Sequence, residues 1–453
     1  MKGTRNLNMT QGSPTRLLLA FAIPMLIGNL FQQLYSLTDS VIVGQFLGSD
    51  ALAAVGSTGS VTFLFFSICN GIGSGAGIVV AQLFGAGQHK RTKRAIANAA
   101  YIMLVASLLM GVTAFFAAPA VLGLMGVPED LLPDATTYMR MSCLGVPLVA
   151  VYNYSSSMLR SLGDSKTPLY FLVFSSFLNV ALDLLFVCVF GMEVFGAALA
   201  TIIAQVISGV GCLAYAVKHN PYFHLEKDDM QPDGLIIRQA VRLGLPMALQ
   251  WSLISVSSTA LQTFVNSFGA EAMAAFTAIN RIEHLVHMPY GSISAALGTY
   301  AGQNFGAHNM KRVKEGLWHG MMISMVFTLV MMLAYQLLNE PIMRLFVKET
   351  PVILIGGGAL KLTSWFYTFL ALIYMTRGVL NGVGDAMFAL INGVVEVVCR
   401  VAIPMALVAL IPDIGTDGIW WTTVITWMIS SLFCLLRYVA WRKKADFSKS
   451  VVA

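Results

Sequence analysis

The phrase QLFGAGQHKRTK, residues 82–93, returns 221 residues later as QNFGAHNMKRVK, residues 303–314. The match extends upstream without gaps to Ala51 and Ala272, and about a dozen aligned positions are identical. The loop MLRSLGD, which ends at Asp164, meets VLNGVGD in the same register. Self-similarity of this length at one fixed spacing predicts that the chain consists of two related halves.

The composition indicates an integral membrane protein. Hydrophobic residues make up 57% of the chain and charged residues only 11%, whereas soluble domains carry about 25% charged residues. Apolar stretches of the roughly 20 residues that cross a bilayer recur along the whole length. We therefore expect an all-α membrane fold of about twelve spans, six per half. The expected centres are Leu26, Phe66, Val105, Leu148, Phe174, Ala204, Ile254, Ser292, Phe327, Tyr367, Val397 and Thr426.

The repeat predicts the domain organisation. We expect an N-terminal six-helix lobe over residues 1–217, a polar cytoplasmic linker over 218–234 and a C-terminal six-helix lobe over 235–453. Because each half has an even number of spans, both halves have the same orientation and are related by a pseudo-two-fold axis along the membrane normal. Two such bundles favour a cleft with alternating exposure, as in transporters. A channel or a receptor is the alternative.

Basic residues fall in alternate loops and so predict the topology. Lys and Arg gather in residues 90–94, 218–242, 311–314 and 442–444. By the positive-inside rule these loops and both termini are cytoplasmic, and the apolar run from Leu17 is retained as the first span of a multi-pass protein of the cytoplasmic membrane. The net charge of +6 reflects this topology. It does not favour nucleic-acid binding, because the basic residues are divided among short loops.

Charged side chains inside spans indicate function. A charge at mid-membrane costs about 2.5 to 3.5 kcal/mol even on the insertion scale, so each one requires a reason. Asp39 lies near the outer end of the first span. Tyr35 precedes it by one helical turn, and Gln32 lies a further turn back on nearly the same face.

Two further polar positions lie in the fifth and sixth spans. Asn179 and Asp183 share a helix face at i, i+4 spacing, and Thr201 lies in the next span. Together with Asp39 they offer all-oxygen ligation to a small hard cation such as Na⁺. The two carboxylates could equally hold a shared proton. Taken singly, Asn179 and Thr201 would be ordinary helix–helix hydrogen-bonding residues.

The second half has polar groups at different places. Glu396 and Arg400 are one turn apart, and we favour an ion pair within the helix over direct contact with a substrate. Glu283 and His287 are also one turn apart. They could line the cleft and bind a cationic substrate or carry a proton, or they could belong to a solvated network near a helix end.

At this point the sequence resembles a known family. The stretch PMLIGNLFQQLYSLTDSVIVGQFLG from residue 24, the two repeated phrases, MLRSLGDSKTP and RLGLPMALQ are similar to the multidrug and toxic compound extrusion (MATE) family of cation-coupled efflux antiporters. The branch related to the DNA-damage-inducible F protein resembles this chain most. The similarity covers the whole chain, and no single motif carries it.

The resemblance implies a cation site in the N-terminal lobe. In that branch the site consists of an aspartate of the first helix, an Asn and an Asp of the fifth and a Thr of the sixth, which implies Asp39, Asn179, Asp183 and Thr201 here. Tyr35 and Gln32 would be neighbours, and Asn153 would line the cavity. Other branches use acidic residues of the seventh and tenth helices, which this chain lacks in residues 243–267 and 360–375.

We therefore expect a secondary antiporter that exports amphipathic, often cationic, organic compounds in exchange for Na⁺ or H⁺. The substrate cavity would include Gln32, Asn153, Glu283, His287, Glu396 and Arg400. We expect no enzymatic activity, no cofactor besides the coupling ion, and function as a monomer in the lipid bilayer. A flippase for lipid-linked oligosaccharide precursors is the alternative, although it predicts additional spans and several cavity arginines. An ATP-driven pump is not favoured, because the chain has no GxxxxGK[ST] phosphate loop.

Overall fold

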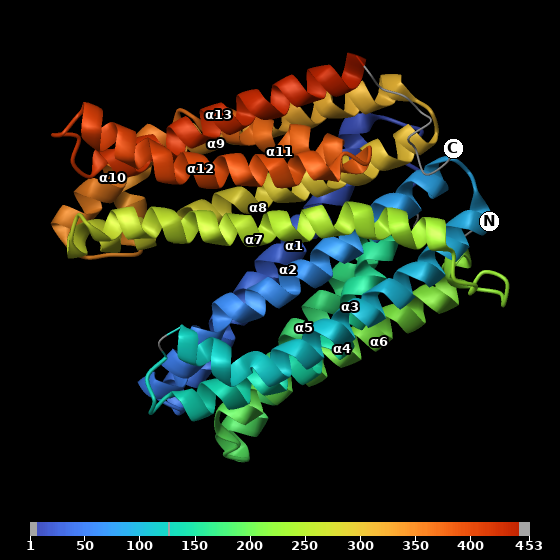
Figure 1. Ribbon diagram of the computed structural model, residues 1–453, viewed down its shortest axis with the longest axis horizontal. Helices are drawn as coiled ribbons and strands as arrows, with labels where there is room; N and C mark the ends of the chain where they lie inside the picture. Colours follow the sequence, from blue (N-terminus) through green and yellow to red (C-terminus); the bar gives the residue numbers. More distant parts are fainter. Residues whose placement is uncertain (1–6, 126, 444–453) are drawn as a thin grey trace. The chain divides into compact units, whose positions relative to one another are not determined.

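The computed structural model describes residues 7–125 and 127–443, and in this part of the chain every regular element is a helix (Figure 1). The first half forms α1 (Pro14–Phe46), α2 (Ser49–Gly85), α3 (His89–Leu124), α4 (Leu132–Ser161), α5 (Lys166–Asp183), the π-helix η1 (Leu184–Val189), α6 (Glu193–His219) and the short η2 (Pro221–Phe223). The second half forms α7 (Gly234–Asn266), α8 (Ala270–Gly306), α9 (Met310–Arg344), α10 (Thr350–Ser364), α11 (Tyr367–Gly382), α12 (Ala386–Leu410) and α13 (Asp417–Lys443).

Helix length and hydropathy agree with a multi-pass membrane protein. Eight helices in the described residues are long and apolar enough to span a bilayer, and α10 with α11 forms one more such span, bent by 55°. Every predicted span centre lies inside a helix, and the centre at Tyr367 falls at the bend between α10 and α11. The prediction of an all-α membrane fold is confirmed.

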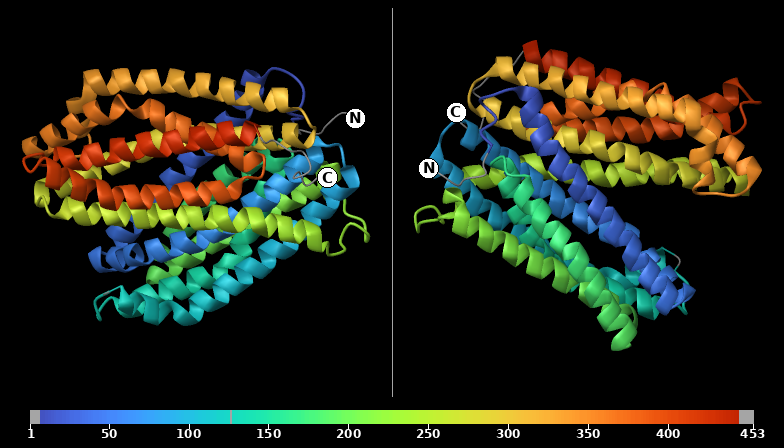
Figure 2. Two further views of the ribbon diagram at one scale, coloured as in Figure 1. Left: turned by 45° about the horizontal axis from the view of Figure 1, so that its top comes forward. Right: turned by 180° about the vertical axis from the view of Figure 1, so that it is seen from behind.

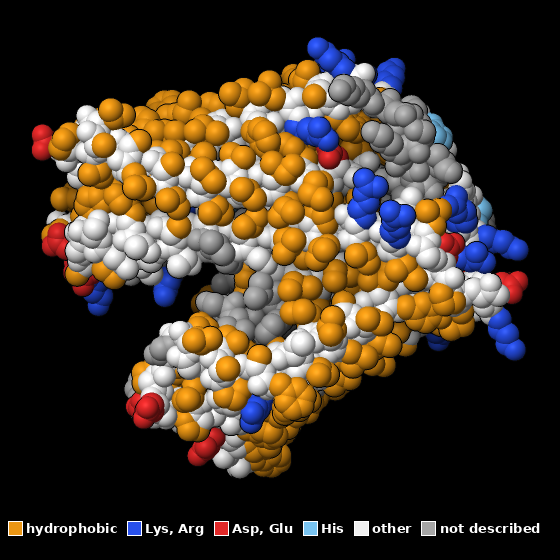
Figure 3. Space-filling model, viewed as in Figure 1, with side chains coloured by type: hydrophobic (Ala, Val, Ile, Leu, Met, Phe, Trp, Pro, Cys, Tyr) orange, Lys and Arg blue, Asp and Glu red, His pale blue; other side chains and the backbone are white. Residues whose placement is uncertain are grey.

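Apolar side chains also cover the outside of the helices. Phe116 is 74% exposed, Trp318 66% and Met405 70%. Exposure of such side chains is unfavourable in water but not in lipid. Figure 3 shows such side chains along the helix flanks, with most Lys and Arg side chains near one end of the helices. This distribution fits helices that present apolar flanks to lipid and charged ends to water.

The helices are divided into two compact units. The first contains Ile23–Ala248, and the second contains Met9–Ala22 together with the chain from Leu249 onward. The start of α1 therefore belongs to the second unit and the start of α7 to the first. The lobes expected over residues 1–217 and 235–453 follow the sequence repeat, and the compact units follow packing, so their limits differ at these two helices.

The segments that lead into α1 and α7 are each hydrogen-bonded at or near a copy of the repeated basic phrase. In the second unit the Met9 amide donates to Gln303 Oε1 at 2.9 Å, and Arg312 Nη2 donates to the Met9 carbonyl at 3.1 Å. In the first unit the Asp233 amide, just before α7, donates to Asn98 Oδ1 at 2.8 Å. These hydrogen bonds anchor the segments that lead into α1 and α7.

The backbone repeats with the sequence. Left-handed φ angles occur at positions related by the same 221-residue spacing, namely Gly48 (91°) and Gly269 (87°), Gly87 (70°) and His308 (55°), and Gly163 (90°) and Gly384 (92°). Glycine adopts such angles without the steric penalty of a Cβ atom. The two halves therefore share loop geometry as well as helix order.

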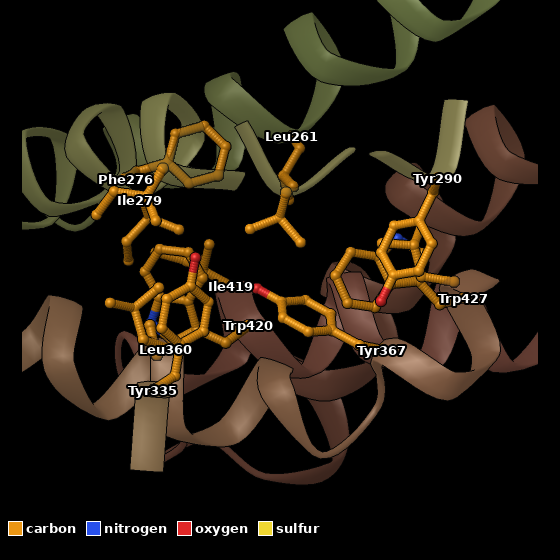
Figure 4. Packing of buried hydrophobic residues seen from close by; sticks show 14 of the residues in the cluster. Leu261, Phe276, Ile279, Tyr290, Tyr335, Leu360, Tyr367, Ile419, Trp420 and Trp427 are labelled. Carbon is orange, nitrogen blue, oxygen red and sulfur yellow. The ribbon is translucent and has the colours of Figure 1, made fainter. Parts of the chain in front are cut away.

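Small residues allow helices inside each unit to pack closely. A Cβ atom at Gly209 of α6 would lie 2.8 Å from the backbone nitrogen of Tyr152 in α4. In the second unit a Cβ at Gly378 of α11 would lie 2.6 Å from the Ser294 carbonyl oxygen of α8. Helices in lipid are not driven together by the hydrophobic effect, so close van der Waals packing at small residues stabilises their association instead. The second unit also has a large aromatic core, with Tyr290, Tyr335, Tyr367 and Trp427 (Figure 4).

Candidate cation site

In the first unit, α1 packs along α5 (Figure 2). A Cβ atom at Gly28 would lie 3.3 Å from Leu172, so the helices approach closely there. Further along, the rings of Phe31 and Phe177 are in tilted contact, with 6.2 Å between centroids. The residues that follow on α1 therefore lie beside the last turns of α5, where two of the predicted site residues are.

This packing brings Asp39 and Asp183 together. Their side chains are close enough to interact directly, and Asp183 is fully buried. Tyr35 is close enough to both carboxylates to interact electrostatically with them. Three side chains that the sequence placed on two different helices thus form one cluster.

Asn179 and Thr201 form a second contact of the same cluster. Asn179 is one turn before Asp183 on α5, and its Nδ2 donates to Thr201 Oγ1 on α6 at 3.3 Å. Asn179 is only 2% exposed. The hydrogen bond fixes the amide so that its oxygen remains available for another partner.

Several oxygens of this cluster lack a hydrogen-bond donor. Among the described residues, no partner is found for Asp39 Oδ1, Asn179 Oδ1 or either carboxylate oxygen of Asp183. An ionised carboxylate can only accept hydrogen bonds, and a buried acceptor without a donor costs about 1 to 3 kcal/mol. Carboxylate, amide and hydroxyl oxygens are hard ligands. The arrangement suits a small cation or a proton held between the two carboxylates.

The backbone changes geometry directly after Asp183. The α-helix ends at this residue and continues as the π-helix η1, whose wider turn includes the bond from the Phe190 amide to the Leu185 carbonyl at 3.0 Å. Short π segments within helices are frequent at functional sites. The sequence of this span, an unbroken apolar run, contains no signal for the wider turn.

Tyr138 of α4 is a site residue that sequence reasoning missed. It packs against the buried cluster that includes Val187 and Val194, and it lies close enough to Asp39 and Asp183 to interact electrostatically with them. No charge marks it in the sequence. A single tyrosine near the end of a span is also common at membrane interfaces, so only the packing of α4 identifies it.

Two predicted cavity residues do not join the cluster. Gln32 is exposed. Asn153 of α4 is partly buried, and within the described residues no hydrogen bond joins it to Asp39, Asn179, Asp183 or Thr201.

The predicted ion pair between Glu396 and Arg400 is wrong. The ion pairs among the described residues join Arg94 to Asp233 and Arg437 to Asp385. Glu396 Oε1 instead accepts from Asn392 Nδ2 at 3.0 Å and from Ser430 Oγ at 3.2 Å. These neutral donors from α12 and α13 satisfy the carboxylate, so it does not need the guanidinium one turn away.

Glu283, His287 and Arg400 do come together, inside the second unit. Arg400 lies close enough to Glu283 and His287 to interact electrostatically with both. His287 Nδ1 is 3.1 Å from the Tyr374 hydroxyl. These contacts with α11 and α12 place Glu283 and His287 among packed helices, whereas the neighbouring Arg281 is exposed.

Comparison with known proteins agrees with this fold. The MatE family model matches residues 24–185 and 246–405, one match in each half. The chain is 29% identical over 392 residues to the probable multidrug resistance protein YpnP of Bacillus subtilis, covering 86% of this chain and 87% of that protein. It is 25% identical over 447 residues to the probable multidrug resistance protein NorM of Thermotoga maritima, covering 96% and 95%.

A solved structure shows the same architecture. A crystal structure of MATE in the bent conformation superposes with a TM-score of 0.91 at 25% identity, covering 98% of this chain and 99% of that one. The prediction of twelve membrane helices in two bundles is thereby confirmed.

Proposed function

Because this chain belongs to the MATE family of membrane transporters, we propose that it is a cation-coupled antiporter that exports amphipathic, often cationic, organic compounds. The names of its relatives, which include multidrug resistance and multidrug export proteins, support this substrate class. The coupling ion would be Na⁺ or H⁺. We expect transport without catalysis and without a cofactor other than that ion.

One observation supports the coupling mechanism above the others. The carboxylates of Asp39 and Asp183 lie close enough to interact directly, and among the described residues no hydrogen-bond donor contacts Asp39 Oδ1 or either carboxylate oxygen of Asp183. Both carboxylates can remain ionised in this interior only if a cation lies between them, and a proton on either one would remove half of the charge. Asn179 and Thr201 would supply the neutral oxygens that complete the coordination of Na⁺.

Coupling requires that cation and drug disfavour each other's bound state. With the site open to the outside, Asp39 and Asp183 would take up the cation, and loss of their charge would let the helices of the first unit repack and release the drug. A cationic drug that needs the free carboxylates would then compete with the ion. A coupling free energy of about 1 to 3 kcal/mol between the two ligands is typical and sufficient for exchange.

Drug export by purified protein in liposomes tests the proposal. We expect Asp39→Asn and Asp183→Asn proteins, inserted as well as the unmodified protein, to lose most of the drug gradient that an inward Na⁺ or H⁺ gradient builds. Varying the Na⁺ gradient at fixed pH, and then the reverse, identifies the ion. A full drug gradient with both aspartates replaced would contradict the proposal.

We further propose that the protein lies in the cytoplasmic membrane as a functional monomer with both termini inside. The alternation of basic loops supports this orientation. A green fluorescent protein fused to the C-terminus should fluoresce, and alkaline phosphatase fused there should be inactive. Active alkaline phosphatase would place the C-terminus outside.

A further inference from the structure

Two neutral side chains hold the Glu396 carboxylate by one of its oxygens. Oε1 accepts from Asn392 Nδ2 at 3.0 Å and from Ser430 Oγ at 3.2 Å. The Asn392 amide is itself fixed, because its Oδ1 lies 3.0 Å from Ser430 Oγ and 3.6 Å from Cys434 Sγ. Asn392, Ser430 and Cys434 are fully buried. This network fixes the orientation of the carboxylate without cancelling its charge.

The second carboxylate oxygen of Glu396 is free. Among the described residues no hydrogen-bond donor contacts Oε2, and this oxygen is not buried. Glu396 lies about 15 Å from the start of α12, near the middle of the span. A charge at this depth is unfavourable and indicates a functional role.

Helix geometry places this free oxygen away from lipid. Successive residues are about 100° apart around a helix, so Glu396 lies about 60° from Gly393 and about 160° from Val394 and Val398. A Cβ at Gly393 would lie 3.3 Å from Leu253 of α7, so this side of α12 packs inside the second unit. Val394 and Val398 are exposed on the opposite side. A ligand therefore reaches Oε2 from the inner side of α12.

Arginines lie in the same part of the second unit but do not pair with Glu396. Among the described residues, neither Arg400, one turn further along α12, nor Arg377 of α11 forms an ion pair with it. The Arg377 guanidinium lies over the Tyr374 ring, 5.0 Å from its centroid. Because these positive charges weaken the negative potential, a cation gains most by direct contact with Oε2, where the Coulomb attraction is strongest.

The free oxygen suits an organic cation better than a small metal ion. Hard metal cations require several oxygen ligands, but Asn392 Oδ1 and Ser430 Oγ are already occupied by the network. An organic ammonium group needs only one carboxylate oxygen for a charge-assisted hydrogen bond. Val395 and Val397, which flank Glu396 and are partly accessible, offer contact to its apolar part.

We propose that Glu396 recognises the charged amine of the exported compound, and that Asn392 and Ser430 are positioning residues that hold its carboxylate in place. This inference rests on the proposed export of organic cations and assigns recognition of their charge to one residue of the second unit. The compound thereby gains a contact separate from the aspartate pair of the first unit.

Equilibrium binding to the purified full-length protein tests this assignment with two probes that differ in charge. Dansylcadaverine is an amphipathic fluorescent amine, and its N-acetyl derivative is neutral. Fluorescence anisotropy, corrected for empty detergent micelles, gives the affinity for each probe. We expect the unmodified protein to prefer the amine. Glu396→Gln should weaken amine binding about tenfold or more and change binding of the neutral probe by less than about twofold.

Further variants separate the charge from its positioning. Glu396→Asp keeps the charge and should retain part of the preference for the amine. Ser430→Ala and Asn392→Ala keep the carboxylate but release Oε1, so each should weaken amine binding by about threefold. Glu340→Gln removes an exposed carboxylate from α9. It is the control for the change in net charge and should leave both affinities unchanged.

The ratio of the two affinities decides the assignment. If Glu396→Gln keeps the preference for the amine, or loses affinity for both probes equally, Glu396 does not recognise the charge. An unmodified protein without any preference would contradict the assignment as well. If Glu396→Gln does not fold, an unchanged ratio in Ser430→Ala and Asn392→Ala contradicts it.

This result is separate from ion coupling, because binding is measured without an ion gradient. A preference that depends on Glu396 stands even if the Asp39→Asn/Asp183→Asn protein exports drug in full. A preference that persists without Glu396 overturns the assignment even if that double variant exports none.

Discussion

Asn179 Nδ2 on α5 donates to Thr201 Oγ1 on α6 at 3.3 Å. This hydrogen bond joins the two helices beside Asp183. It orients the Asn179 amide so that its oxygen, Oδ1, faces away from Thr201. If these oxygens hold the coupling ion, the hydroxyl acts both as the anchor of the amide and as a ligand.

Thr201→Val keeps the shape of this side chain and removes the hydroxyl. We expect the affinity for the coupling cation to fall about fivefold or more, since losing one such hydrogen bond costs about 1 kcal/mol. Thr201→Ser, which keeps the hydroxyl, should stay close to the unmodified protein. The measurement is the cation concentration for half-maximal drug export. A loss of affinity in Thr201→Ser but not in Thr201→Val would show that packing of the methyl group matters instead.

The cation affinity of the aspartate pair should depend on pH. Protons and Na⁺ compete for the same carboxylates, so acidification should weaken Na⁺ binding and alkalinisation should strengthen it. Equilibrium binding of radiolabelled Na⁺ between pH 5 and 9 checks this. This pH-dependent Na⁺ binding should disappear in the Asp39→Asn/Asp183→Asn protein. Binding that does not change with pH would exclude ionisable ligands.

Asp164 and Asp385 occupy equivalent positions in the two halves but have different partners. Asp164 is 5% exposed and accepts from the Lys166 and Thr167 amides and the Thr167 hydroxyl at the start of α5. Asp385 instead pairs with Arg437 at 2.7 Å, and Arg437 is 47% exposed.

Alanine substitution should reveal this difference. We expect Asp164→Ala to destabilise the protein by about 1 to 2 kcal/mol, because the amides of the first turn of α5 lose their acceptor. Asp385→Ala should cost less, because the arginine of its ion pair is exposed to water. Unfolding temperatures of the purified proteins check the order. A larger loss for Asp385→Ala would contradict it.

Glycine at position 163 should be required for two separate reasons. Its φ of 90° is left-handed, and a Cβ there would clash with the Leu7 carbonyl oxygen. Gly163→Ala should therefore lower stability more than Gly48→Ala, which has φ 91° but open space around it. We expect the left-handed conformation alone to cost an alanine about 1 to 2 kcal/mol of stability at either position.

A third glycine serves as the control. Gly234→Ala, at the start of α7, has no heavy atom within 4 Å and no left-handed φ, so its stability should stay the same or rise slightly. If the three alanine variants unfold at the same temperature, neither φ nor the contact with Leu7 limits these positions.

The sequence by itself determined the membrane fold, the two related halves and the helices that carry Asp39, Asn179, Asp183 and Thr201. These follow from hydropathy, a fixed repeat and helical periodicity, which are properties of local sequence. The same local reasoning failed for Glu396, because i, i+4 spacing allows an ion pair but does not show that Asn392 and Ser430 satisfy the carboxylate.

Only the tertiary structure decided which polar groups meet. Tyr138 lies near the aspartates through the packing of α4, and Thr363 of α10 lies beside Glu283 of α8. Neutral hydroxyls cost little to place in a span and are common there, so nothing in their own segments distinguishes them. They become identifiable only when packing places them near a carboxylate of another helix.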